Sequence, residues 1–281
     1  MAWWQFWRRG ARQGSAATAR AADPSRRSIL GRRFVAGVPY VLPKDDAEIN
    51  RLDFQHYMLR SVLRSNYAAP IDRPRDIVDV GTGTRWWAAE MAIQFPQANV
   101  IGLDIVPPPA DEQSARSIRP GNYVFVAGNI LEGLPFEDAS FDFVHQRMLV
   151  GAIPAERWQS VVNELTRITR RGQWVELLEA GSAVGGGRGL ETLNYWGITA
   201  AARRGITISM SERIGSFLEQ AGLAKVTFRE VRIPLGKHGG RLGSMMEANY
   251  RKWARKPPVF SRGMNGPSDV RPLLKNSRLS T

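Results

Sequence analysis

Short apolar runs alternate with amphipathic stretches between about residues 40 and 225. A run of four to six apolar or β-branched residues, bounded by Gly, Pro or polar residues, is typical of a strand buried in a parallel sheet. Apolar residues spaced three and four apart predict helices between these runs. Five strands are expected on this basis, at residues 76–80, 99–104, 123–126, 141–145 and 173–178.

The helices have their own start and stop signals. Asp45 or Asp46 is expected to cap a first helix that runs to about Asn66, and Pro154 stands at the first position of another that runs to Arg170. Further helices are expected after the turn at residues 81–84, ending at Phe95, and in residues 190–202, 211–221 and 243–256, with a glycine-rich loop at 185–189. Strands that alternate with helices imply right-handed βαβ units, so an α/β fold with helices on both faces of a mostly parallel sheet is predicted.

The end of the sheet is less regular. Residues 225–233 alternate with period two, which predicts a half-exposed sixth strand. No segment after residue 233 predicts a seventh, so the sheet is expected to lack its last strand and to expose an edge.

The composition excludes several classes of protein and site. The 281 residues contain no cysteine, which excludes a disulfide scaffold, a zinc finger, an iron–sulfur cluster and a cysteine nucleophile. No apolar run approaches the length of a membrane-spanning helix. The net charge of +13 is concentrated at the ends, because residues 1–34 carry +7 and residues 232–281 carry +9, whereas residues 35–231 carry −3.

We therefore expect one domain, residues 40–256, between basic ends at 1–39 and 257–281 that are disordered. The aromatic residues near the N-terminus, between Trp3 and Trp7, leave a membrane-surface anchor or an organelle transit peptide open. A cytoplasmic location is the expectation, nucleic acid is not excluded as a partner of the basic ends, and the oligomeric state is not determined.

The strongest chemical signal is the sequence Asp79-Val-Gly-Thr-Gly83 between a predicted strand and a helix. Glycines let the backbone approach a ligand, and a helix N-terminus offers free N–H groups. Asp104 ends the next strand, where an acid can accept hydrogen bonds from both ribose hydroxyls of a nucleoside. The third glycine of a dinucleotide fingerprint is absent, and Asp79 would repel a pyrophosphate but suits an ammonium group, which favours S-adenosylmethionine over NAD.

With these residues the chain resembles the class I S-adenosylmethionine-dependent methyltransferases. It is most similar to a subgroup that includes fungal regulators of secondary metabolism and many bacterial proteins. The resemblance covers about residues 40–250 and includes Leu42-Pro43, Arg51-Leu-Asp53, Gln55-His56, Leu134-Pro-Phe136, residues 140–147 and Trp174-Val-Glu-Leu177.

The resemblance implies roles by position. Asp79, Gly81, Thr82 and Gly83 would surround the methionine part of S-adenosylmethionine, and Asp104 the ribose. The adenine would meet Ile105, Asn129 and Ile130, with Asn129 in place of the usual aspartate. Residues 145–148 would line the place where the methyl group meets its acceptor.

Two departures from the family stand out. Arg85 occupies the position of the family's third glycine, where its side chain is expected either to hinder the cofactor or to pair with its carboxylate. Arg171-Gly-Gln173 replaces a Pro-Gly-Gly turn.

Methyl transfer from a sulfonium is an in-line displacement, so positioning and desolvation can supply most of the acceleration. A base is needed only for a protonated acceptor. His145, at the carboxyl end of the fourth strand, is the first candidate, and His56 is the second. Trp86, Trp87, Tyr195 and Trp196 could shape an apolar acceptor pocket, although the first two could equally be core residues. No metal site is expected.

Methyl transfer to a small, apolar metabolite is the first function that the sequence predicts. RNA or protein methylation is an alternative that rests only on the basic ends. A catalytically degenerate nucleoside-binding or regulatory protein is another, and it rests on Arg85 and the absent last strand.

Overall fold

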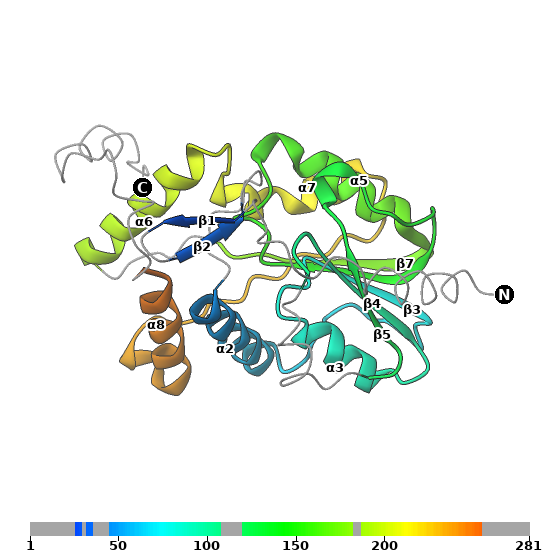
Figure 1. The fold of residues 1–281 in the computed structure, drawn as a ribbon, viewed down its shortest axis with the longest axis horizontal. Coiled ribbons are helices and arrows are strands. Elements are labelled where there is room, and N and C mark those ends of the chain that lie inside the picture. Colours follow the sequence, from blue (N-terminus) through cyan, green and yellow to red (C-terminus); the bar gives the residue numbers. More distant parts are fainter. Residues whose placement is uncertain (1–25, 30–31, 36–44, 108–119, 182–186, 255–281) are drawn as a thin grey trace.

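The computed structural model describes residues 26–29, 32–35, 45–107, 120–181 and 187–254. Its centre is a five-stranded sheet in the order β5-β4-β3-β6-β7, in which every neighbouring pair is parallel (Figure 1). The strands are β3 (Asp76–Val80), β4 (Asn99–Asp104), β5 (Tyr123–Ala127), β6 (Phe141–Arg147) and β7 (Thr169–Leu178). The five predicted strands and the predicted α/β fold are confirmed.

Helices cover both faces of the sheet, as Figure 1 shows. Helix α3 lies on one face, and α5 with α7 lies on the other, while α2 and α8 pack together beside α3. The helices are α2 (Asp46–Leu63), α3 (Trp86–Gln94), α5 (Trp158–Ile168), α6 (Gly187–Ala202), α7 (Ile214–Gln220) and α8 (Gly240–Ala254). Short 3-10 helices are η1 (Ile130–Glu132), η2 (Ala155–Arg157), η3 (Ile208–Arg213) and η4 (Lys237–Gly239).

Alternating strand residues fill two separate cores. Ile77 of β3 and Phe143 of β6 point to the α3 face, where Trp87 is fully buried. Val78 and Val144, one residue further along each strand, join the core under α5 and α7. Because side chains alternate across a strand, an apolar run without polar interruptions is what a sheet covered on both faces requires.

Helix α2 begins as its sequence predicts. Asp45 is the N-cap, and its side chain accepts a hydrogen bond from the Glu48 amide at 3.1 Å. Arg51, one turn further along, pairs with the Glu48 carboxylate at 2.8 Å and also donates to Asn249 Oδ1 of α8 at 3.1 Å. These buried contacts join α2 to α8.

Three local expectations are wrong. Arg26–Ile29 (β1) and Arg32–Val35 (β2) form an antiparallel pair inside the N-terminal segment expected to be disordered. Residues 171–173 do not form a turn between elements but lie within β7, where the register slips between Phe141 and Phe143 and Gly172 adopts φ +76°. Gly187 and Gly189 begin α6 instead of belonging to a loop.

The sixth strand is also absent. Residues 225–233 adopt no regular secondary structure, and Phe228 is 73% exposed. A strand needs a neighbouring strand to satisfy its backbone hydrogen bonds. Residues 222–235 are separated from the edge of β7 by a cavity that both segments line, so the alternating pattern pairs with no strand among the described residues. The edge of β7 is correspondingly unpaired in the described part of the chain.

A helix suitable for crossing a lipid bilayer, in length and in apolar character, is not found among the described residues.

Candidate functional site

The turn after β3 is shaped by two glycines. Gly81 and Gly83 have φ of +75° and +54°, a region that L-amino acids with a side chain seldom adopt. A Cβ atom on Gly81 would also lie 2.8 Å from Leu149 Cδ1, so the Leu149 side chain would have to shift to admit one. The Gly81 and Thr82 amides donate to the Leu103 carbonyl at 2.8 and 2.9 Å, which ties the turn to the end of β4.

Asp104 ends β4 beside this turn. Its Oδ2 accepts a hydrogen bond from the Gly83 amide at 2.9 Å, and its Oδ1 accepts one from the Val106 amide at 3.2 Å. The side chain is 8% exposed. Backbone donors therefore hold the carboxylate in one orientation at the pocket.

These residues line a cavity of about 150 Å³, which we call the turn pocket. It brings together eight of the residues singled out in the sequence, namely His56, Gly81, Thr82, Gly83, Asp104, Ile105, Asn129 and Ile130. Leu103, Leu131, Leu149 and Ile153 give it apolar walls. The pocket lies at the carboxyl ends of β3 and β4, where open α/β sheets bind ligands.

Asn129 has a structural partner as well as a place in this pocket. Its Oδ1 accepts from the Leu131 amide at 3.1 Å, and its Nδ2 donates to Glu132 Oε1 at 2.8 Å. The side chain thus caps η1 and has one free lone pair on Oδ1.

His145 does not lie in the turn pocket. The imidazole is 1% exposed, stacks on the Trp87 ring with centroids 3.7 Å apart, and places Nδ1 2.8 Å from Asp79 Oδ1. Asp79 is equally buried, and its carboxylate faces His145 instead of the pocket. The expectation of His145 as a base that meets the acceptor is not supported by this geometry, because the ring is enclosed between Trp87 and Asp79.

His56 does line the turn pocket, but its Nδ1 is engaged by Arg147 and its Nε2 faces Glu90. Arg147 donates to Nδ1 at 2.9 Å, so Nδ1 carries a lone pair and the proton of the neutral ring is on Nε2. Nε2 lies 3.2 Å from Glu90 Oε2. Burial and the Arg147 charge lower the pKa of His56 to about 4, against a smaller opposing effect of Glu90. The ring orients Arg147 and has no lone pair free for a substrate proton.

Arg85 lies just outside the turn pocket. It is the N-cap of α3 and has φ +70°, which is the left-handed conformation that a glycine would adopt without strain. Its side chain lines neither cavity described here. The backbone of this position therefore matches the family's glycine, and the effect of the guanidinium on the cofactor stays a prediction.

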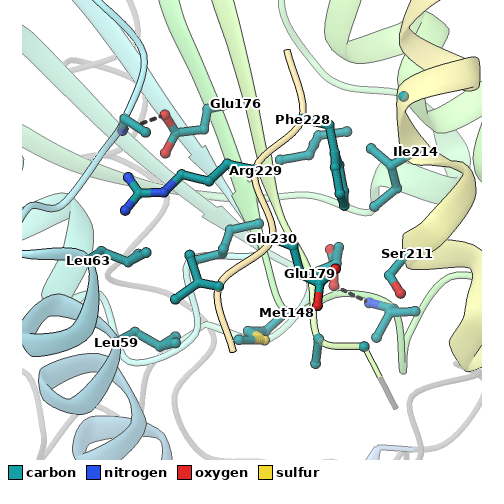
Figure 2. Close-up of a pocket in the computed structure, with 18 of the residues that line it drawn as sticks. Leu59, Leu63, Met148, Glu176, Glu179, Ser211, Ile214, Phe228, Arg229 and Glu230 are labelled. Carbon is teal, nitrogen blue, oxygen red and sulfur yellow. Dashed lines mark hydrogen bonds between the residues drawn. The ribbon is translucent and has the colours of Figure 1, made fainter. Parts of the chain in front are cut away.

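A second, larger cavity of about 1860 Å³ adjoins the first, and we call it the edge cavity. It lies between the free edge of β7 and the extended residues 222–235 (Figure 2). Leu52, Gln55, Leu59 and Met148 line both cavities, so the two share one wall. Its lining is mainly apolar, and it includes Leu63, Ile198, Ile214 and Leu218.

The four aromatic residues considered for an acceptor pocket line neither cavity. Trp87 is a core residue, as the alternative interpretation expected, and its Nε1 donates to the Asn66 carbonyl at 2.6 Å. Trp196 is 40% exposed. The apolar surface comes from aliphatic side chains instead.

Sequence reasoning missed Glu179 and Leu149, whereas Arg147 and Met148, which line the turn pocket, belong to the range 145–148 expected near the acceptor. Glu179 follows β7 directly, as Asp104 ends β4, so an inspection of the acid after each strand could have found it. Its carboxylate accepts from the Leu149 amide at 3.0 Å and from the Val150 amide at 2.8 Å. Leu149 has no signal of its own in the sequence, since only the fold brings it against Gly81.

Residues 77–172 match the model of a methyltransferase domain. Methyltransferase str2 of Strobilurus tenacellus is 31% identical over 214 residues, which are 70% of this chain and 71% of that protein. Methyltransferase str3 of the same fungus is 36% identical over 142 residues, and that match spans only 48% of its length and 50% of this chain.

One solved structure supports the fold. It is an O-methyltransferase family protein from Burkholderia thailandensis, similar at a TM-score of 0.50 and 17% identity over 66% of this chain and 56% of that one. At that identity the similarity supports the arrangement of strands and helices alone.

Proposed function

This chain belongs to the class I S-adenosylmethionine-dependent methyltransferases, and from that premise we propose that it methylates a small, largely apolar metabolite. The observation that carries the proposal is the shared wall of the two cavities. The turn pocket has groups suited to a nucleoside, and the edge cavity beyond Leu59 and Met148 is large and mainly apolar.

The residues of the turn pocket fit S-adenosylmethionine by their chemistry. Asp104 offers carboxylate oxygens to ribose hydroxyls, and Ile105 and Ile130 offer apolar surface to an adenine ring. Asn129 would accept from the adenine amino group with the lone pair that η1 leaves free. When bound, this cofactor supplies a methyl group that is already activated for transfer.

The size of the pocket indicates how such a ligand would lie. A volume of about 150 Å³ is below the roughly 300–1,000 Å³ of typical ligand pockets. A nucleoside held by Asp104 would therefore extend past Met148 toward the edge cavity. The chain's own contribution to the reaction would be to hold donor and acceptor in line across this wall and to keep water out.

The test is calorimetry of the full chain with S-adenosylmethionine and S-adenosylhomocysteine, followed by incubation of methyl-labelled cofactor with a mixture of small lipophilic metabolites. We expect submillimolar binding and label in organic-extractable small molecules. No binding at millimolar concentration, or label only in an RNA or protein fraction, would contradict the proposal. The basic ends that motivate the RNA or protein alternative lie mostly outside the described residues.

A second candidate function is binding without turnover, as in a regulatory protein. The observations that favour it are the left-handed Arg85 at a glycine position and the unpaired edge of β7. Tight binding of S-adenosylmethionine with no labelled product from any fraction would support this alternative. A cytoplasmic location, and a targeting role for the N-terminal segment, remain predictions.

A further inference from the structure

A carboxylate of the edge cavity accepts a hydrogen bond from a residue of the turn pocket. Glu179 lines the edge cavity next to Met148, and Figure 2 shows its side chain at the end of that cavity away from Glu176. The Leu149 amide that donates to Glu179 belongs to the residue whose side chain packs on Gly81 in the turn pocket. The Glu179 carboxylate is therefore hydrogen-bonded to the backbone of a residue whose side chain lines the pocket proposed for the methyl donor.

Glu179 meets no opposite charge in the described part of the chain. Its hydrogen bonds come from the Leu149 and Val150 amides, with a weaker contact to Gln146 Nε2 at 3.5 Å. Acidic and basic side chains surround Glu179 on several elements. Those of the edge cavity are Arg51 of α2, Arg167 of α5, Arg170, Arg171 and Glu176 of β7, Glu212 of η3, Lys225, Arg229, Glu230 and Arg232 of the extended segment, and His238 of η4, and those of the turn pocket are His56, Asp104 and Arg147. None of these makes an ion pair with Glu179 among the described contacts.

Burial dominates the titration of this group. It raises the pKa of Glu179 to about 7, against the opposing effect of the hydrogen bonds from Val150, Leu149 and Gln146. A carboxylate in an apolar cavity without a counter-charge favours a cationic ligand that restores neutrality.

We infer that Glu179 binds the nitrogen of an amine acceptor and takes up its proton before methyl transfer. This inference rests on the proposed function and names its substrate class: a molecule with an apolar body for the edge cavity and an ammonium group for Glu179. The proton passes from the ammonium nitrogen to the carboxylate, which leaves a neutral amine with a lone pair. That lone pair forms the new N–C bond while the C–S bond of the donor breaks, and its electron pair remains on sulfur.

Glu176, near the end of β7, provides a matched control. Its carboxylate also accepts from two successive backbone amides, those of Ala68 and Ala69, both at 2.7 Å, and it also lines the edge cavity. The residues that it holds do not line the turn pocket, whereas Leu149, which donates to Glu179, does. Glu176→Gln therefore measures how binding changes when a carboxylate that holds two backbone amides is lost. Any further loss of amine binding in Glu179→Gln is specific to the acceptor site.

The test compares octylamine with octanol as probes, by calorimetry on the full chain saturated with S-adenosylhomocysteine. At about pH 8 we expect octylamine to bind at least about tenfold more tightly than octanol, a preference that Glu179→Gln removes and Glu176→Gln keeps. Equal binding of the two probes, or the same loss in both variants, would overturn the inference.

A pH series on the unaltered protein keeps the test independent of how Glu179→Gln folds. An alkylamine stays protonated from about pH 5.5 to 8.5, so its binding should tighten as Glu179 ionises near pH 7, whereas octanol binding should stay constant. A pH-independent octylamine affinity would overturn the inference. If S-adenosylhomocysteine binds but octylamine is not preferred, only this inference is contradicted. If S-adenosylhomocysteine does not bind, the proposed function is contradicted as well.

Discussion

The Gly83 amide donates to Asp104 Oδ2 at 2.9 Å, which joins the glycine turn after β3 to the end of β4. The two features that separately indicated a nucleoside site are thus one hydrogen-bonded unit. The ligand would meet a carboxylate whose orientation is set by the backbone before binding, so little ordering remains to be done when it binds.

Asp104→Ala should weaken binding of S-adenosylhomocysteine by about 1.5–3 kcal/mol, the range for a hydrogen bond to a charged group. Calorimetry measures this as a loss of roughly 10- to 150-fold in affinity. Asp72→Ala is the control, because Asp72 is almost fully exposed and its nearest ion-pair partner is Arg73 at 4.0 Å. An Asp104→Ala affinity within about a factor of two of the parent would mean that the ribose lies elsewhere.

His145→Ala should destabilise the fold by about 3–5 kcal/mol, because the buried Asp79 carboxylate loses its partner. The stack on Trp87 is lost as well. Urea unfolding measures the change, with His238→Ala as an exposed control that should shift stability by less than about 0.5 kcal/mol. A variant that keeps its stability but loses turnover would restore a catalytic role for His145.

His56 should make the fold sensitive to acid. Its pKa is about 4 in the folded protein against 6.5 for the ordinary side chain, so between these values the unfolded chain binds more protons. Its contribution to stability is therefore present above about pH 6.5 and is lost as the pH falls toward about 4.

The measurement is the urea midpoint of the parent and of His56→Gln at about pH 4.5 and 7. Glutamine can still accept from Arg147 and donate to Glu90, but it does not titrate. We expect a smaller fall in stability for the variant over this interval. Parallel pH curves would show that His56 is protonated in both states or in neither.

Arg85→Gly should stabilise the fold by about 1 kcal/mol, since glycine relieves the strain of φ +70°. Affinity for S-adenosylhomocysteine should stay within about twofold, because the Arg85 side chain lies outside the turn pocket. Arg75→Gly is the control. It is exposed and has no positive φ, so glycine there should cost about 0.5–1 kcal/mol.

Two outcomes would contradict this prediction. A tenfold loss of affinity in Arg85→Gly, about 1.4 kcal/mol, would make the guanidinium a cofactor ligand. A clear gain of affinity would instead mean that the side chain obstructs the pocket.

Local sequence patterns predicted the strands of the sheet and, in the turn pocket, the glycine turn and Asp104. The apolar runs at Ile77-Val78 and Phe143-Val144 identify strands buried on both faces, because alternate residues must enter different cores. Asp45 and the glycines of the turn act through neighbouring backbone groups, so their conformations follow from sequences of a few residues. Asp104 could be placed beside Gly83 because adjacent parallel strands end at the same edge of the sheet.

The rest was decided by contacts between residues distant in the sequence. The pattern of residues 225–233 is that of a strand, but a strand forms only when a neighbouring strand supplies its hydrogen bonds. The edge cavity separates this segment from β7, whose outer edge is unpaired in the described part of the chain. His145 lies near the carboxyl end of β6, where the sequence predicted a catalytic base, yet the tertiary structure places it between Trp87 and Asp79. The sequence by itself determined which residues could do the chemistry, and the packing of side chains decided which of them reach a cavity.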